Sequence, residues 1–228
     1  MSLIVAIGDV HGCDDLLAEM HGRIFDHILA CGADDVTVVH IGDYIDRGRE
    51  NIAVIDRLMR GLPGVECICL KGNHEALMLD CLRTDYDAVW IRWLRNGGDM
   101  TLYDLDYDIG VSGFSPDDLR AAIGDDRIAW LQRLPLSFAK GPYFFAHAGV
   151  RPGIALDRQS EKDLLWIRHE FLESDADHGA IVVHGHTPIP EPALRPNRIG
   201  IDTAAVMGGK LTAVLLDDPE PPRFLFAR

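Results

Sequence analysis

Carboxylate, imidazole and amide side chains recur in five glycine-bearing segments of this 228-residue chain. The second segment, from Gly42 to Gly48, places Asp43, Asp46 and Arg47 within five residues. An aspartate can bind a divalent metal ion, and the planar guanidinium of arginine fits the oxygens of a phosphate group. These residue types therefore predict a metal ion and a phosphate group in one site, with Asp46 placed to orient a third group.

The other four segments supply further oxygen and nitrogen donors. They contain, in chain order, Asp9 and His11, Asn73 and His74, His147, and His186. This donor set has no thiolate and suits Mn²⁺, Fe or Zn²⁺. Six ligands exceed what one ion with open positions needs, so two ions about 3.5–4 Å apart that share a bridging carboxylate fit better. Such a pair would clamp a phosphate and ionise a bound water into the nucleophile.

Each of these segments follows a short apolar run, which predicts a β-strand that ends at the site. The predicted strands are residues 3–7, 36–41, 65–70, 143–146 and 181–183. Helical periodicity predicts helices that open at residue 14 and at 52–59, 76–82, 120–131 and 164–171. Alternating strands and helices predict a parallel sheet, whose loops converge at the carboxyl ends of the strands. The expected fold class is α/β, completed by antiparallel strands at 198–202, 211–216 and 224–226.

Residues 84–116 break this pattern, because they are rich in Asp, Gly and aromatic residues. The segment is too short to bury a core of its own, so it is interpreted as an insertion that caps the site within a single domain, 1–228. Packing is the expected role of Trp93. Exposed acidic residues in the segment would favour phosphorylated peptides with basic flanks.

Composition limits the compartment and the partners. Hydrophobic residues make up 47% of the chain, enough for a sizeable core, and the net charge of −14 argues against a nucleic-acid partner. The five cysteines are odd in number and form no Cys-x-x-Cys pair, which favours a reducing compartment. The N-terminal apolar run is too short for a signal peptide, and no stretch approaches a membrane span. A cytoplasmic protein without membrane partners is expected; its oligomeric state stays open.

The five segments together resemble the motifs of the PPP-type serine/threonine protein phosphatases, in the bacterial and phage branch of the calcineurin-like metallophosphoesterases. The matching motifs are Gly8-Asp9-Val10-His11-Gly12, Gly42-Asp43-Tyr44-Ile45-Asp46-Arg47-Gly48, Gly72-Asn73-His74-Glu75, His147-Ala148-Gly149 and Gly185-His186-Thr187-Pro188. Trp93-Leu94-Arg95-Asn96-Gly97-Gly98 also looks like a bacterial feature. The resemblance implies a four-layer αββα sandwich, with two mixed sheets between helical layers. It also implies hydrolysis of phosphoserine and phosphothreonine in proteins by a water activated at a dinuclear metal centre.

The resemblance implies a role for each site residue. Asp9 and His11 would hold the first metal ion, Asp43 would bridge, and Asn73, His147 and His186 would hold the second. The metal is expected to be Mn²⁺, with Fe or Zn²⁺ as alternatives. His74 would protonate the leaving alkoxide, with Asp46 orienting its ring. Arg47 would bind the phosphate together with a second arginine, for which Arg168 is preferred over Arg151. His184 is expected in the core, and Ala204 stands where relatives carry glycine.

Three other readings compete with a protein phosphatase. Hydrolases of diadenosine tetraphosphate share the fold, but they usually lack an acidic residue at the position of Asp46 and carry Asp at that of Glu75. Both differences favour the protein phosphatase. A non-catalytic binding module should have lost a ligand or the general acid, and none is missing here. A nuclease or phosphodiesterase is disfavoured by the acidic charge and by the absence of a basic stripe.

Overall fold

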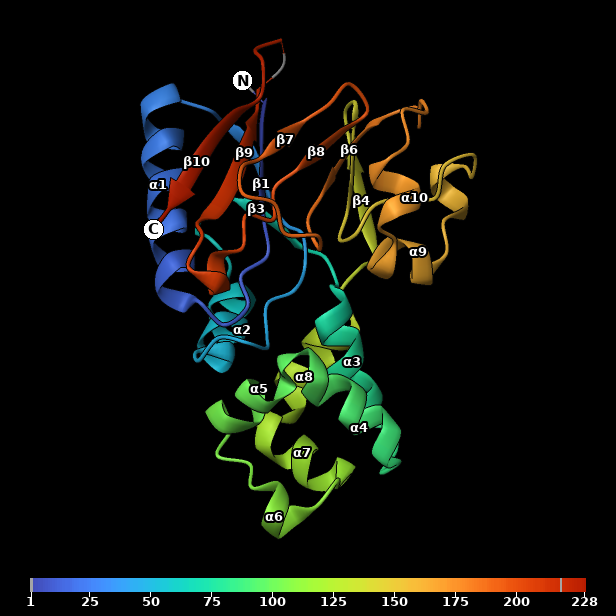
Figure 1. The fold of residues 1–228 in the computed structure, drawn as a ribbon. Helices are drawn as coiled ribbons and strands as arrows, with labels where there is room; N and C mark the ends of the chain where they lie inside the picture. The colour runs from blue at the N-terminus through green and yellow to red at the C-terminus, as the bar shows by residue number, and fades with distance from the viewer. Residues whose placement is uncertain (1, 218) are drawn as a thin grey trace.

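A computed structural model describes residues 2–217 and 219–228 and shows two mixed sheets flanked by helices (Figure 1). The first sheet has the order β10-β9-β1-β2-β3. In it β1, β2 and β3 run parallel to one another, β9 pairs antiparallel with β1, and β10 pairs antiparallel with β9. Its strands are β1 (Ser2–Ile7), β2 (Asp35–His40), β3 (Glu66–Cys69), β9 (Leu211–Leu216) and β10 (Arg223–Ala227). The arrangement confirms the predicted fold class and the α/β start of the chain.

The second sheet has the order β4-β5-β6-β8-β7. Its strands are β4 (Ser137–Lys140), β5 (Tyr143–Ala146), β6 (Ile181–His184), β7 (Ala193–Leu194) and β8 (Arg198–Gly200). The expectation of an antiparallel strand at 198–202 holds on one side of β8 only, because β8 pairs antiparallel with β7 and parallel with β6. The two-residue β7, which the sequence did not predict, runs antiparallel to β8. The chain therefore reverses twice between β6 and β8, which restores its direction.

The alternation of side chains along β1 explains the layers. Leu3, Val5 and Ile7 lie in the core cluster that includes the buried faces of the helices, whereas Ile4 and Ala6 pack against residues of the second sheet. Successive side chains of a strand point to opposite faces, so a strand buried on both sides must be apolar throughout. The continuous apolar run at the N-terminus is the consequence of this double burial.

Helices cover the outer faces of both sheets (Figure 1). On the first sheet lie α1 (Asp14–Cys31) and α2 (Asn51–Arg60), and on the second lie α9 (Glu161–Trp166) and α10 (His169–Leu172). The predicted helix 164–171 is interrupted, because Arg168 adopts a non-helical backbone (φ −134°, ψ −96°). Short 3₁₀ turns occur at η2 (Leu156–Arg158) and η3 (Ala205–Met207).

The remaining helices form a lobe at one end of the sandwich (Figure 1). They are α3 (Asn73–Cys81), α4 (Asp87–Trp93), the π-helical turn η1 (Leu94–Gly98), α5 (Asp99–Asp104), α6 (Ile109–Ser112), α7 (Pro116–Ile123) and α8 (Asp125–Gln132). The predicted helix 120–131 is split at Gly124, whose φ of 89° ends α7. Trp90, Trp93 and Leu102 of the expected insertion are buried in the same core cluster as the helix-facing side of the first sheet. No helix of the described residues is long and apolar enough to cross a membrane.

Candidate metal centre

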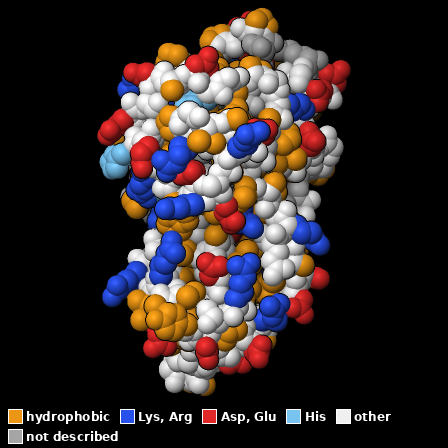
Figure 2. All heavy atoms as spheres, turned by 90° about the vertical axis from the view of Figure 1, so that its right-hand side faces the viewer, with side chains coloured by type: hydrophobic (Ala, Val, Ile, Leu, Met, Phe, Trp, Pro, Cys, Tyr) orange, Lys and Arg blue, Asp and Glu red, His pale blue; other side chains and the backbone are white. Residues whose placement is uncertain are grey.

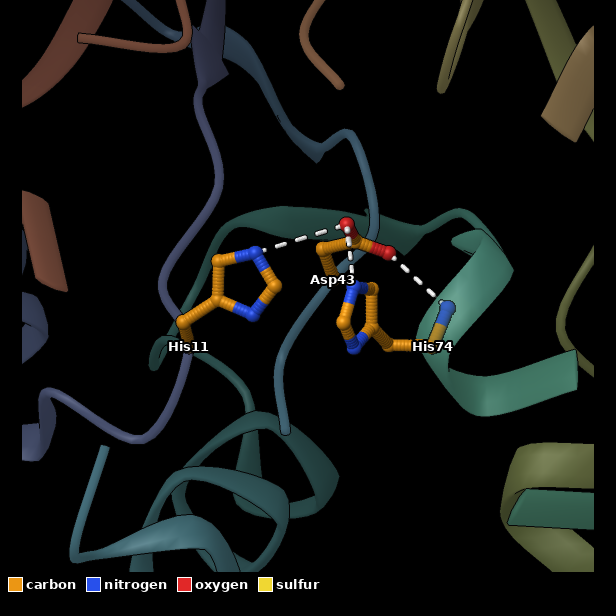
Figure 3. Close-up of side chains that lie close together, drawn as sticks. All are labelled: His11, Asp43 and His74. Carbon is orange, nitrogen blue, oxygen red and sulfur yellow. Dashed lines mark hydrogen bonds and ion pairs between the residues drawn. The ribbon is translucent and has the colours of Figure 1, made fainter. Parts of the chain in front are cut away.

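The five predicted segments meet where the strands of the two sheets end towards the helical lobe (Figure 1). Asp43 is the shared member of two groups of donor atoms that lie within 4.8 Å of one another. One group is His11, Asp43 and His74, and the other is Asp43, His147 and His186. Figure 3 shows the Asp43 carboxylate joined to the neighbouring rings of His11 and His74. Asp43 is thus in a position to serve two ions, which is the bridging role that the family resemblance implies for it.

Backbone carbonyl groups set which nitrogen of two histidines is free. His11 Nδ1 lies 2.8 Å from the Ile45 carbonyl, and His147 Nδ1 lies 3.1 Å from the Ile41 carbonyl. Each Nδ1–H therefore donates to the backbone and leaves an Nε2 lone pair, as in many metal-binding histidines. His147 Nε2 lies 2.9 Å from Asn73 Oδ1, which is also an acceptor. Two lone pairs that face each other are the arrangement a cation satisfies, so these residues fit a bound metal.

The buried charges of the site also fit a bound metal. Asp9, Asp43 and Asp202 are all buried. Burial together with the nearby charges of Asp202 and Asp43 raises the pKa of Asp9 well above its usual range. Burial lowers the pKa of His11 to about 3, so this imidazole is neutral at pH 7, the form that binds metals. Divalent cations would relieve the repulsion among the buried carboxylates, because a bound ion is the largest local charge in such a site.

Asp9 is held by the loop that carries His186. The backbone N–H of His186 donates to the two carboxylate oxygens of Asp9, at 3.3 and 3.1 Å. Gly185 permits this contact, since a Cβ at that position would collide with Asp9 Oδ1. The structure therefore brings together all six expected ligands, although His74 and not Asp9 completes the first of the two closest groups.

His74 and Asp46 form a buried pair beside Asp43. His74 Nδ1 lies 2.7 Å from Asp46 Oδ2, and His74 Nε2 lies 3.8 Å from Asp43 Oδ2. Burial favours a neutral ring, but the charge of Asp43 and the hydrogen bond with Asp46 outweigh it and raise the pKa of His74. An imidazolium held at a phosphate site is the form needed for a general acid.

Two residues of the helical lobe hold Asp46 and were not predicted as site residues. Trp93 Nε1 donates to both Asp46 oxygens, at 3.1 and 2.9 Å, and Thr101 Oγ1 donates to Asp46 Oδ1 at 2.6 Å. Trp93 is fully buried and packs near Trp90, so the expected packing role is only part of its function. The sequence signal was the Trp-x-x-Asn-Gly-Gly motif, but the sequence does not show that its tryptophan contacts Asp46.

Glu75 joins two of the loops. Its carboxylate accepts hydrogen bonds from the backbone N–H groups of Gly72, Asp43 and Tyr44, at 2.8, 3.0 and 2.8 Å. Burial and the charge of Asp43 raise the pKa of Glu75 to about 7. The glutamate thereby fixes Asp43 relative to the first turn of α3, where Asn73 and His74 lie. This role also was not predicted from the sequence.

Arg47 reaches the centre from a position fixed by the helical lobe. Its backbone N–H donates to the Gly97 carbonyl at 3.0 Å, and its guanidinium nitrogens Nη1 and Nη2 lie 2.8 and 3.0 Å from His11 Nε2 and His74 Nε2. Gly97 has a φ of 103°, and a Cβ there would lie 2.6 Å from Arg47 Cγ. The guanidinium is therefore placed between an expected metal ligand and the expected general acid.

The contacts of Arg168 and Arg151 distinguish them as candidates for the second phosphate-binding arginine. Arg168 Nε donates to His186 Nε2 at 3.1 Å, which puts its guanidinium at the centre. Arg151 instead binds Asp163 through two nitrogens, at 3.0 and 2.6 Å. The geometry thus supports the preference for Arg168. His184 packs against Phe171 with ring centroids 5.0 Å apart, in keeping with its expected core position.

The site concentrates unusual backbone conformations. Among the described residues, seven other than glycine have a positive φ, and five of these are candidate site residues. They are His11, Asp43, Asp46, Arg47 and His186. A positive φ is sterically strained for residues other than glycine, and such strain is concentrated at functional sites, where side chains must point at a ligand. Ala204 also has a φ of 59°, which explains why glycine suits that position.

Fold and donor set together define the class of metal-dependent phosphoesterases. The model of the calcineurin-like phosphoesterase family matches residues 2–221, and the chain belongs to this family. The asymmetrical bis(5'-nucleosyl)-tetraphosphatase PrpE of Anoxybacillus flavithermus is 24% identical over 94% of this chain and 90% of its own length. Serine/threonine-protein phosphatase 1 of Salmonella typhimurium is 28% identical over 90% of this chain and 88% of its own.

A solved structure assigned as a diadenosine tetraphosphatase has a TM-score of 0.67 to this chain. It is 21% identical, and the match covers 99% of this chain and 94% of that one. This likeness establishes the fold, including the two-sheet sandwich, and leaves the substrate to the chemistry of the site.

Proposed function

We propose that the protein hydrolyses phosphoserine and phosphothreonine monoesters of proteins. The observation that carries this proposal is the buried His74–Asp46 pair, with its 2.7 Å hydrogen bond. A serine or threonine alkoxide is a poor leaving group and needs a proton as the ester bond breaks. In a dinucleoside polyphosphate the leaving group is itself a phosphate, which departs without that help. A histidine that Asp46 holds in place as a proton donor therefore favours an alkyl ester as the substrate.

Two divalent ions would be held by the six ligands, with Mn²⁺ expected and Fe or Zn²⁺ as alternatives. When bound, they would supply a nucleophile at neutral pH and neutralise charge on the phosphate. Those ligands are Asp9, His11, Asp43, Asn73, His147 and His186.

The chain's own residues then act on the substrate. Arg47 and Arg168 are placed to donate to phosphate oxygens in the charge-assisted geometry that arginine provides. His74 gives its proton to the oxygen of the leaving serine or threonine. Asp46 holds the ring in position and stabilises its positive charge. Burial raises the pKa of Asp46, and the hydrogen bonds from His74, Thr101 and Trp93 oppose that rise because they favour the ionised carboxylate.

Hydrolysis of diadenosine tetraphosphate is the second candidate. The observation in its favour is the likeness over nearly the whole chain to the asymmetrical tetraphosphatase of Anoxybacillus flavithermus. The two functions differ in what they require of His74, so they can be separated by the leaving group.

A substrate panel tests the proposal. The purified protein would be assayed with Mn²⁺, Fe²⁺ and Zn²⁺ on a phosphoserine peptide, diadenosine tetraphosphate and a phosphodiester. A higher kcat/KM on the peptide than on the other two supports the proposal, and faster hydrolysis of the dinucleotide rejects it. For the compartment we propose the cytoplasm, supported by five cysteines that are all free thiols.

A further inference from the structure

A groove lies beside the metal centre, between the helical lobe and α9. It has a volume of about 610 Å³, and α3, α4 and α9 contribute to its walls. Its charged lining consists of Lys71, Asp80, Arg83, Arg92, Glu161 and Lys162. The proposed hydrolysis uses none of these six side chains, so their position in the groove is not explained by that reaction.

Trp166 connects the groove to the centre. Its ring lines the groove and lies 6.0 Å, centroid to centroid, from the ring of His186, at an interplanar angle of 83°. Two residues further on, Arg168 donates to the same histidine. A substrate whose phosphate sits at His186 and Arg168 therefore has its neighbouring atoms at the mouth of the groove.

The groove carries an excess of positive charge. Four cationic side chains face two carboxylates, and one of these carboxylates, Asp80, pairs with Arg83 at 2.9 Å. Among residues 2–217 and 219–228, no ion pair joins Lys71, Arg92 or Lys162 to a carboxylate. Figure 2 shows Lys and Arg side chains gathered in the middle of this face. In a chain of net charge −14, cations without an ion-pair partner beside a candidate phosphate site favour an anionic ligand.

The aromatic residue in the groove is not free to stack with a nucleobase on one of its faces. The Arg92 guanidinium lies over the ring of Trp166, 4.8 Å from its centroid. That cation–π contact fixes the arginine in the groove wall and leaves its charge available to an anion. The observations therefore favour a carboxylate-bearing ligand over the second nucleoside of a dinucleotide.

We propose that this groove binds acidic side chains next to the phosphorylated serine or threonine, so that the enzyme prefers phosphoproteins with acidic flanks. The inference rests on the proposed function and specifies its substrate. It replaces the expectation of basic flanks, which depended on the acidic residues of 84–116. Three of those residues, Asp99, Asp106 and Asp108, line a different groove with Tyr103 and Tyr107.

The test compares three phosphoserine peptides that differ only in acidic, neutral or basic flanks. For wild type at low salt we expect kcat/KM for the acidic peptide to exceed that for the basic one by about three- to tenfold, and to fall with added salt, as exposed ion pairs do. The overall charge of −14 would by itself repel the acidic peptide, so this order can come only from local cations.

Charge reversal locates the effect. Lys162→Glu should lower the ratio of kcat/KM for acidic over basic peptide by about three- to tenfold. The ratio is taken within one variant, so any general loss of activity cancels. Arg60→Glu is the matched control, because Arg60 is exposed on α2 and is not part of the groove lining, and its ratio should equal that of wild type.

Each contrary result has a distinct meaning. If wild type hydrolyses all three peptides but shows no acidic preference, or if Lys162→Glu keeps the wild-type ratio, the groove does not select acidic flanks although the proposed function stands. If diadenosine tetraphosphate is hydrolysed and none of the peptides is, the proposed function fails and the inference fails with it.

Discussion

The indole nitrogen of Trp93 donates to both carboxylate oxygens of Asp46, at 3.1 and 2.9 Å. The tryptophan belongs to the helical lobe and the aspartate to the loop after β2, 47 residues earlier in the chain. Asp46 in turn binds His74, so the lobe completes the pair that is proposed to donate the proton. The segment that the sequence suggested as a cap thus contributes two hydrogen-bond donors to a residue of the candidate site.

Replacement of Trp93 tests this link. Trp93→Phe keeps most of the ring volume but removes the donor to Asp46, and a hydrogen bond to a charged group contributes about 1.5–3 kcal/mol. We expect kcat for an alkyl phosphate to fall by roughly 10- to 100-fold, with metal content unchanged. Trp90→Phe is the control, because Trp90 Nε1 donates to the Thr84 carbonyl. Equal losses in both variants would point to a general disturbance of the lobe.

Replacement of His74 tests the general acid itself. His74→Asn should lower kcat for a phosphoserine peptide by about 10²–10⁴-fold, the usual contribution of a general acid. The loss should be much smaller for p-nitrophenyl phosphate, because p-nitrophenolate leaves without a proton. Steady-state kinetics on both esters, with metal analysis of each sample, measures this. A loss of the same size on both esters would argue against proton donation by His74.

Asp43 is expected to decide the metal content, since it belongs to both groups of ligands. Wild type should bind two divalent ions per chain by elemental analysis. Asp43→Asn removes the shared charge and should reduce the content to one ion or fewer, with loss of most activity. Asp126→Asn, a change on the exposed surface of α8, should leave both unchanged. A fully active wild type with one tightly bound ion would rule out the two-ion centre.

Stability should depend on pH through a buried histidine pair, His21 and His40. Their Nε2 atoms lie 2.9 Å apart. Burial and the charge of Arg57 lower the pKa of His21 to about 4, and burial and His21 lower the pKa of His40 well below its usual range. The unfolded chain titrates near pH 6.5, so below that pH it takes up protons that the folded chain does not. The free energy of unfolding therefore falls as the pH drops from about 6.5 towards 4.

Urea unfolding between pH 7 and pH 4 measures this dependence. One pKa unit corresponds to about 1.4 kcal/mol, so the shift of His21 amounts to roughly 3 kcal/mol at pH 4. His21→Leu should flatten the pH dependence, whatever its effect at pH 7. His169→Gln removes a histidine whose side chain is 84% exposed and should keep the wild-type slope. Identical slopes for wild type and His21→Leu would show that His21 is not responsible.

The sequence by itself determined the strands that lead to the site and the residue types that follow them. Most residues of β1, β2 and β5 are apolar because both faces of these strands are buried, and this pattern can be recognised in the sequence. Parallel strands must also end at one edge of a sheet. Convergence of the loops with Asp9 and Asp43 therefore followed from local pattern and topology. His147 follows β5 of the second sheet, and it joins them because the two sheets pack together.

Only the tertiary structure decided which distant groups complete the site. The hydrogen bonds of Trp93 and Thr101 to Asp46 join residues 47 and 55 positions apart, and no local period encodes them. The choice of Arg168 over Arg151 depended on the nearby Asp163, which neutralises Arg151. The direction of β8 depended on two chain reversals with no strong sequence signal. Contacts of this kind arise from packing the whole chain, because a side chain's partner is set by the surface it meets and not by its sequence neighbours.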